Sequence, residues 1–385
     1  PPPPPPPPPP FSSLRRNTRF LHRSRGLGDV YKRQVKGPCG AKALIIIAMI
    51  NFFRRIRKKL ADDNQFLKYS RYAIGEIVLV VIGILIALQI NTWNEERLDK
   101  EKTSRLFKEA HKELVYNIKQ SSSVIDYYRK KDSLLYKVIH KQVTYEDYKT
   151  NWELRVLVTG DRPANLTSDA FNNLINNEGS LTQQEDSIVL KLKKLFATRK
   201  RLVDEHDIKT VSNVDRHMEK LKNEKVWYSQ LMLVPDEQID FFLNDPFYLN
   251  EVKHFEIYAL QTHLMAVKDF KVDATSIYEE LSDYLDLKKD TSIVKDLNDY
   301  DHYLGTFELD SLYNAKIERE NNRLNLKIIA KNDTTVVDRA PIYPDSKTYF
   351  NIFSGFGKFT FDENDTVTGI IVSFGSEREE FKKID

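Results

Sequence analysis

The longest apolar stretch of the chain lies between Tyr72 and Trp93 and contains the run IVLVVIGILIALQI, from Ile77 to Ile90. About 20 residues at a helical rise of about 1.5 Å each cross the hydrocarbon core of a bilayer. The core helix of a soluble protein carries a polar stripe, which this run lacks. A cleavable signal peptide has a shorter apolar region and a small-residue cleavage site, which ALQINTWNEER lacks. The pattern therefore predicts one uncleaved transmembrane helix over residues 72–93.

Basic residues are concentrated on one side of this helix. The preceding residues, 49–71, contain the amphipathic segment FFRRIRKKL, whereas the following flank, NEERLDKEK, mixes both signs of charge. Lysine and arginine in short flanks stay on the cytoplasmic side, and such a segment can lie along an anionic bilayer surface. We therefore expect a cytoplasmic N-terminus, a chain that continues outside the cytoplasm, and the lipid bilayer as a partner. The juxtamembrane basic residues are Arg54, Arg55, Arg57, Lys58 and Lys59.

Polar and small residues interrupt the apolar stretch at a few positions. Acidic residues inside membrane helices usually mark functional sites. Glu76, however, lies one turn from the expected cytoplasmic boundary, close to Arg71 and Tyr72, where it can reach interfacial water. Two interpretations of Glu76 stay open: it makes a pairing contact within the membrane, or it lies at the cytoplasmic edge of the membrane. The candidate anchor residues are Glu76, Gly83, Gln89, Asn91 and Trp93.

Helical periodicity continues after the apolar stretch. Leu106, Ala110, Leu114 and Ile118 recur every four residues, which is typical of a helix with one buried face. Similar stripes predict a long helix after Leu181 and a last one from about Pro246 to Leu287, with short helices before Gly160 and Gly179. Three long helices and two short ones predict an antiparallel helical bundle over residues 94–289.

The periodicity changes from that of helices to that of strands near Asp290. After a linker over residues 290–302, short runs such as RLNLKIIA and TGIIVSFG alternate with turns such as ENN and PDS. This pattern predicts eight strands, and thus a small antiparallel β-barrel or meander over residues 303–385. The expected fold class is α+β and membrane-anchored, with a transmembrane helix that continues into a helical bundle and then a β-barrel.

Composition changes this picture mainly at the N-terminus. The 385 residues have a formal net charge of +3, but residues 1–48 contain nine of the 59 basic residues and one of the 56 acidic ones. The remainder is therefore net acidic and lacks the basic face of a nucleic-acid-binding protein. Cys39, the single cysteine, also lies in this segment, so a chain that starts at Met49 has no cysteine for a disulfide, a metal or a nucleophile.

Two segments resemble known sequences. The ten prolines and the segment FSSLRRNTRFLHRSRGLGDVYKRQ resemble a translated homopolymer and sequencing-adaptor fragment, so residues 1–48 are expected to be a non-native or disordered leader. The stretch from Phe52 to Arg97, with YAIGEI, GILIALQI and WNEER, resembles an uncharacterised bacterial membrane-protein family, a domain of unknown function. That resemblance implies a single-pass inner-membrane protein of a Gram-negative bacterium, with a helical region in the periplasm and no assigned activity.

The C-terminal region has its own resemblance. YLGTFEL, YPDSKTYF and FTFDENDTVTGIIV resemble parts of the small β-barrel domain that is appended to serine β-lactamase-like hydrolases. The hydrolase itself requires a Ser-x-x-Lys nucleophile with companion motifs. Only Ser292 and Lys295 have that spacing, the companions are missing, and the pair lies in the linker. The resemblance implies an accessory barrel without catalytic residues, and we interpret the pair as linker surface.

Other clusters of reactive residues favour structural interpretations. VDEHDIKTVSNVDRHME includes His206, Asp207 and His217, but its spacing suits a charged helix surface better than converging metal ligands. His254 and His263 are nine positions apart and are interpreted as structural. DENDTVTG alternates oxygen-bearing residues but lacks the glycine and the distal glutamate of a calcium loop, so a hairpin turn is expected. We therefore predict no catalytic, cofactor-binding or metal-binding residues.

Three hypotheses about function follow. The first is a non-enzymatic periplasmic binding or sensing module, which would need a protein partner or a homo-oligomer to pass on a signal. The second is an envelope scaffold that dimerises through its membrane-proximal helix, and an exposed apolar stripe over residues 106–139 would favour it. The third is an enzyme with a site between bundle and barrel, and a cluster of buried polar residues there would favour it.

Overall fold

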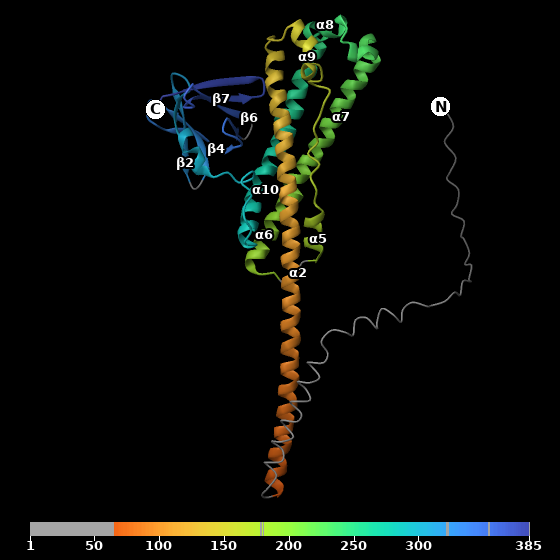
Figure 1. Ribbon diagram of the computed structural model, residues 1–385, viewed down its shortest axis with the longest axis vertical. Helices are drawn as coiled ribbons and strands as arrows, with labels where there is room; N and C mark the ends of the chain where they lie inside the picture. Colours follow the sequence, from red (N-terminus) through yellow and green to blue (C-terminus); the bar gives the residue numbers. More distant parts are fainter. Residues whose placement is uncertain (1–64, 178, 180, 321–322, 353–354, 385) are drawn as a thin grey trace, which may run out of the picture. The chain divides into compact units, whose positions relative to one another are not determined.

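The computed structural model describes residues 65–177, 179, 181–320, 323–352 and 355–384 (Figure 1). The expected leader, residues 1–48, lies outside the described residues, and so do the basic residues from Arg54 to Lys59. The chain divides into two compact units, Pro1–Trp93 and Asn94–Asp385, and each is described by itself.

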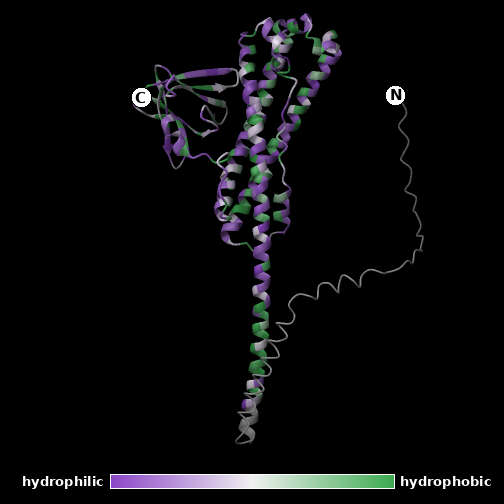
Figure 2. Ribbon diagram, in the orientation of Figure 1, coloured by the Kyte–Doolittle hydropathy of each residue, from purple (hydrophilic) through white to green (hydrophobic). Residues whose placement is uncertain are grey.

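The described part of the first unit is the beginning of helix α2 (Gln65–Ile139). Its apolar side chains are exposed within this unit, with Ile77 at 64% and Leu88 at 58%. Figure 2 shows this part of α2 as a band of hydrophobic residues. Among the described residues, one helix is long and apolar enough to cross a membrane, which confirms the expected apolar helix. The bilayer itself stays a prediction.

The second unit begins with a helical bundle. Its long helices lie side by side and are formed by α2, by the segment from α6 to α7, and by the segment from α9 to α10 (Figure 1). The last two segments each include one stretch of π-helix. The elements after α2 are α3 (Tyr145–Thr150), α4 (Trp152–Arg155), α5 (Asp169–Asn177), α6 (Gln183–Lys194), η1 (Leu195–Lys200), α7 (Arg201–Glu224), η2 (Val226–Leu233), α8 (Asp236–Asn244), α9 (Pro246–Phe255), η3 (Glu256–His263) and α10 (Leu264–Tyr284).

The apolar stripe of α2 forms the centre of this bundle. Leu106, Leu114, Ile118 and Tyr128 are almost completely buried, so the predicted periodicity is confirmed. The start of α6 follows from local chemistry, because Thr182 forms a capping box with Glu185 that satisfies free backbone groups there. The element order confirms the three long helices that the sequence predicts.

Two details of the helical region differ from the prediction. The short helix expected before Gly160 is divided into α3 and α4, because the extended backbone of Asn151 ends the first helix and its side chain caps the second. The pattern also gave no signal for η2 and α8. These elements place Trp227, Phe241 and Phe242 in an aromatic cluster at one end of the bundle.

The rest of the second unit is a closed antiparallel barrel in which each strand pairs with the next and β1 pairs with β8. This confirms the predicted eight-stranded β domain. Phe307, Phe350 and Phe359 fill its core, together with Tyr303 from η4 (Leu297–Tyr303). The strands are β1 (Gly305–Glu308), β2 (Tyr313–Glu320), β3 (Arg323–Ala330), β4 (Val336–Pro344), β5 (Tyr349–Ile352), β6 (Gly355–Phe361), β7 (Val367–Phe374) and β8 (Glu377–Lys383).

The barrel wall is incompletely paired at β4. Strand β4 pairs with β3 from Val336 to Ile342, but it pairs with β5 only through Tyr343 and Pro344. Since β5 is only four residues long, the edge of β4 from Val336 to Ile342 has no strand partner on that side among the described residues. The backbone groups of this part of β4 therefore have no ladder partner on that side within the described residues.

Candidate functional site

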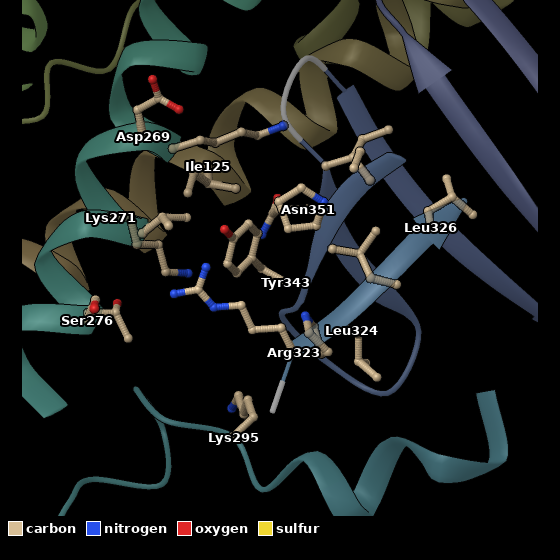
Figure 3. A pocket seen from close by; sticks show the side chains of 18 of the residues that line it. Ile125, Asp269, Lys271, Ser276, Lys295, Arg323, Leu324, Leu326, Tyr343 and Asn351 are labelled. Atoms are coloured by element: carbon tan, nitrogen blue, oxygen red, sulfur yellow. The ribbon is translucent and has the colours of Figure 1, made fainter. Parts of the chain in front are cut away.

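A cavity of about 900 Å³ lies between the helical bundle and the barrel. Its helical wall is formed by one face of α10 and by Ile125 of α2, and its other walls by the segment before η4 and by the barrel strands. Figure 3 shows side chains from α10 and from the strands pointing into this space from opposite sides. The volume lies within the range of small-molecule sites, roughly 300–1,000 Å³.

The barrel side of the cavity carries a row of apolar side chains, with Asp338 of β4 opposite its last residue, Ile328. Leu324, Leu326 and Ile328 of β3 alternate along one face of that strand, and the register places Ile342 and Ala340 of β4 opposite the first two. Because side chains alternate between the faces of a strand, all five belong to the same face. Leu324 and Ile342 are part of the barrel core, and Leu326 and Ile328 pack against it. The cavity therefore extends the apolar interior of the barrel.

The side of the cavity nearest α10 is charged. It is lined by Arg323 of β3, Lys271 of α10 and Lys295 of the segment before η4. Figure 3 shows the Arg323 guanidinium and the Lys271 ammonium facing each other. Among the described residues, no ion-pair partner of Arg323 or Lys295 lies within 4 Å, whereas Lys271 lies 3.2 Å from a carboxylate oxygen of Asp345. Like charges that face each other repel, so this side would be stabilised by an anion.

The acidic residues near these cations are already engaged or shifted toward the neutral form. Arg199 lies 2.8 Å from Asp269 and 2.7 Å from Asp273, so its guanidinium offsets one of the two carboxylate charges. Burial raises the pKa of Glu279, and the positive charges of Lys289 and Arg323 oppose that shift only in part. The remaining acids of the lining, Asp338 and Glu379, come from the barrel strands.

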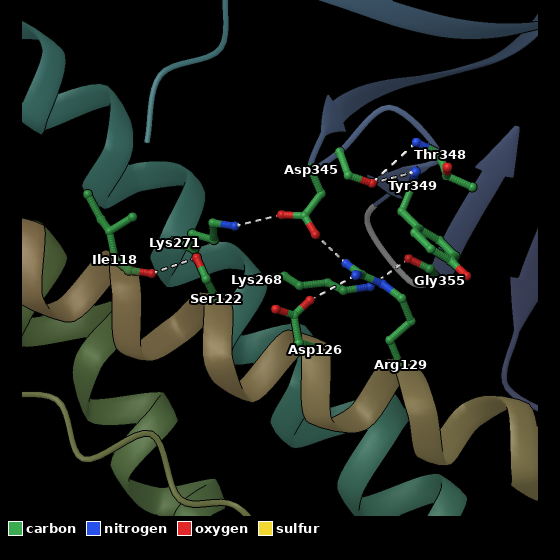
Figure 4. A network of polar contacts seen from close by, with 11 residues as sticks. Ile118, Ser122, Asp126, Arg129, Lys268, Lys271, Asp345, Thr348, Tyr349 and Gly355 are labelled. Atoms are coloured by element: carbon green, nitrogen blue, oxygen red, sulfur yellow. Dashed lines mark hydrogen bonds and ion pairs between the residues drawn. The ribbon is translucent and has the colours of Figure 1, made fainter. Parts of the chain in front are cut away.

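A network of polar contacts joins bundle and barrel beside the cavity (Figure 4). Arg129 of α2 donates to Asp345 at 2.5 Å, and its guanidinium lies over the rings of Tyr349 and Phe356. Lys268 of α10 donates to the carbonyl oxygen of Gly355 at 2.5 Å and lies 3.9 Å from the centre of the Phe356 ring. These contacts fix one edge of the barrel against α2 and α10.

A second part of the network lies deeper. Asp132 accepts a hydrogen bond from the Ser373 hydroxyl at 2.8 Å, and Glu256 accepts one from the Ser376 backbone at 2.6 Å. Burial raises the pKa of Asp132 to about 6, and burial lowers the pKa of Lys268 to about 7. Both shifts have the sign expected when a charged group leaves water. A lysine that titrates near neutrality thus forms part of the cavity wall.

The anchor residues that the sequence singles out are in the first unit, whereas every residue of the cavity is in the second. Glu76, Gln89, Asn91 and Trp93 are exposed in α2, and an added Cβ at Gly83 would meet no atom within 4 Å. Their roles stay predictions.

The Ser-x-x-Lys pair is divided by the structure. The side chain of Lys295 lines the cavity, while Ser292 is exposed outside it. The interpretation of both residues as linker surface is therefore incomplete for Lys295. The segment DENDTVTG forms the turn between β6 and β7, where Asp362 accepts from the backbone of Asn364 and Thr366, so the hairpin prediction is confirmed.

Two histidines pair with acids inside the bundle. Asp207 lies 2.6 Å from His263, which is fully buried, and also accepts from the Ala164 backbone. His217 is buried and lies 3.2 Å from Glu251. The prediction of a solvated surface is therefore wrong for His217 and for the Asp207 carboxylate. Among the described residues, no group of three or more metal-binding side chains converges.

Lys268, Asp132 and Arg323 were missed by the sequence analysis. A signal existed for Lys268, since it follows Leu264 by four positions and lies among the apolar positions of α10 that face the core. Asp132 and Arg323 carried no comparable signal, because a charged residue between polar neighbours is ordinary on a helix or strand surface.

Comparison of the chain with protein-family models, curated proteins and solved structures found no match.

Proposed function

We propose that the chain is a membrane-anchored binding module whose ligand occupies the cavity between the helical bundle and the barrel. The cavity is the observation that carries this proposal, because it combines an apolar row with two cations, Arg323 and Lys295, that have no ion-pair partner in the described part of the chain. That combination is typical of small-molecule sites, in which apolar contacts supply affinity and a few polar groups fix orientation.

The exposed apolar part of α2 supports the membrane anchor. A contiguous band of exposed isoleucine, leucine and valine side chains is unfavourable in water, and a bilayer would cover it. The basic segment before it supports a cytoplasmic N-terminus, and the resemblance of Phe52–Arg97 supports an inner membrane with bundle and barrel in the periplasm. A periplasm-dependent reporter fused after Asp385 and expressed in a Gram-negative host should be active, and an inactive fusion would refute this topology.

Ligand binding is tested with 1-anilinonaphthalene-8-sulfonate, an apolar anionic dye, and the full chain in lipid nanodiscs. The wild type should bind the dye saturably above the background of empty nanodiscs. Ala340→Trp, which places a large side chain in the cavity beside β4, should weaken this signal strongly, whereas Leu312→Trp, at an exposed position outside the lining, should keep it. Equal binding by both variants, or no binding by the wild type, would refute the proposal.

The scaffold hypothesis loses its main support. It needs an apolar stripe that is free to dimerise, but Leu106, Leu114 and Leu135 are buried inside the bundle of the same chain. Association through the exposed apolar part of α2 stays compatible with the proposed function, as does an additional protein partner.

An enzymatic function has one observation in its favour. The buried polar cluster that would favour it is present, and it contains a lysine whose pKa is lowered to about 7 by burial, which is a property of nucleophilic lysines. Lys268, however, donates to the Gly355 carbonyl and lies against Phe356, so its amine is held by the barrel. Borohydride trapping with a small aldehyde should label Lys268 if its amine is accessible, and absence of label would eliminate this alternative.

A further inference from the structure

We propose that the ligand of the cavity is an amphiphile with a single hydrocarbon chain and an anionic carboxylate or phosphate head, the head lying between Arg323 and Lys295. This inference rests on the proposed function and specifies the chemical class of the ligand.

The apolar wall selects the hydrocarbon part. Leu324, Leu326 and Ile328 form a row along β3, and neighbouring side chains of one strand face are separated by about 7 Å. Ile342 and Ala340 widen this row into a strip across two strands. A strip of this form matches an extended chain better than a compact polar molecule, since it supplies continuous apolar contact and few hydrogen-bonding groups.

The charges select the head group and its position. Arg323 and Lys295 lie on the side toward α10, whereas Asp338 and Glu379 line the barrel side, where they would repel an anion. Arg339, the cation on the barrel side, is already paired with Glu320. Arg199 offsets one of the two charges of Asp269 and Asp273, and the one that remains is smaller than the two positive charges of Arg323 and Lys295. An arginine fork can bind a carboxylate or a phosphate through two hydrogen bonds. The charge distribution therefore orients the head toward α10.

The unpaired edge of β4 adjoins the apolar strip. From Val336 to Ile342 this edge lacks a strand partner among the described residues, and the apolar strip begins at the same part of the strand. Ala340 lies on this part of β4 and lines the cavity with the smallest side chain of the strip. A hydrocarbon chain that lies along the strip would thus contact the part of β4 that has the fewest strand contacts among the described residues.

The test uses three photoreactive probes that share an eight-carbon chain with an internal diazirine and differ in the head: carboxylate, phosphate or trimethylammonium. Each is titrated into the full chain in lipid nanodiscs, and adducts on peptides of β3, β4 and α10 are quantified by mass spectrometry. The anionic probes should saturate these peptides at about tenfold lower concentration than the cationic probe. Comparison of the two anionic probes identifies the preferred head.

Three variants complete the test. Arg323→Gln and Lys295→Gln should each weaken labelling by the anionic probes several-fold and leave the cationic probe unchanged. Lys288→Gln removes one charge at an exposed position outside the lining and should change nothing. Equal labelling by all three heads, abolished by Ala340→Trp, would overturn the ligand class but leave the binding function intact. Absence of saturable labelling in the cavity by any probe would overturn both.

Discussion

Lys268 offers the sharpest test of the contact between bundle and barrel. Replacement by methionine keeps an unbranched side chain of similar length over the Phe356 ring and removes the titratable amine. It also removes the hydrogen bond to the Gly355 carbonyl, which leaves a buried acceptor unsatisfied at a cost of about 1–3 kcal/mol. At alkaline pH, the wild type should therefore be more stable than Lys268→Met.

The pH dependence follows from the lowered pKa. Burial lowers the pKa of Lys268 to about 7, against about 10.4 in an unfolded chain. Between these values the unfolded chain binds more protons than the folded one, so the stability of the wild type rises with pH. The free energy of unfolding of the wild type should therefore rise relative to that of Lys268→Met by about 1.4 kcal/mol per pH unit, or about 3 kcal/mol from about pH 7.5 to 9.5.

Urea denaturation of the full chain in nanodiscs, followed by tryptophan fluorescence, measures this difference, since Trp152 and Trp227 both lie in the bundle. Lys288→Met, at an exposed position, controls for the loss of one positive charge. A difference between wild type and Lys268→Met that is constant across the pH range would refute the reasoning, because the amine would then titrate alike in both states.

Two further predictions concern packing. Gly357→Ala should lower the free energy of unfolding by about 1–3 kcal/mol, because the added Cβ would overlap the Phe350 ring in the barrel core. Gly83→Ala, with no atom within 4 Å of the added Cβ, should leave the unfolding of the second unit unchanged. Asn117→Ala should cost about 1–3 kcal/mol and hasten proteolysis near Thr167, since the buried amide of Asn117 donates to the Thr167 carbonyl and accepts from its N–H. An unchanged denaturation midpoint of Gly357→Ala would contradict the first prediction, and an unchanged midpoint and cleavage rate of Asn117→Ala would contradict the second.

The fold was predictable where a periodic pattern runs without interruption. The stripe from Leu106 to Ile118 and the alternation of leucine and isoleucine in β3 indicate which faces are buried, and short turns between strands favour neighbouring antiparallel pairs. The short elements η2 and α8 escaped because their aromatic residues have no clear period. Their structure depends on contacts such as that of Trp227 with Phe241, which form only in the folded bundle.

The candidate site could not be predicted in the same way. Its lining joins Ile125 of α2, residues of α10 and strands up to β8, so it depends on how a bundle and a barrel pack together. Residues such as Arg323 have ordinary surface patterns in the sequence and acquire their role from the packing of β3 against α10, which brings the Arg323 side chain to the cavity. Only Lys268 broke a local pattern, as a charge among core positions of α10.

The central claim is that a ligand occupies the cavity beside β4, and protection of a single cysteine tests it most directly. Cys39 is the only cysteine of the chain, so Ala340→Cys in a Cys39→Ser background gives one reactive thiol in the cavity. We predict that saturating 1-anilinonaphthalene-8-sulfonate slows alkylation of this thiol at least several-fold in nanodiscs, and that it leaves the alkylation of Leu312→Cys unchanged. An equal alkylation rate of Ala340→Cys with and without the dye would contradict the account.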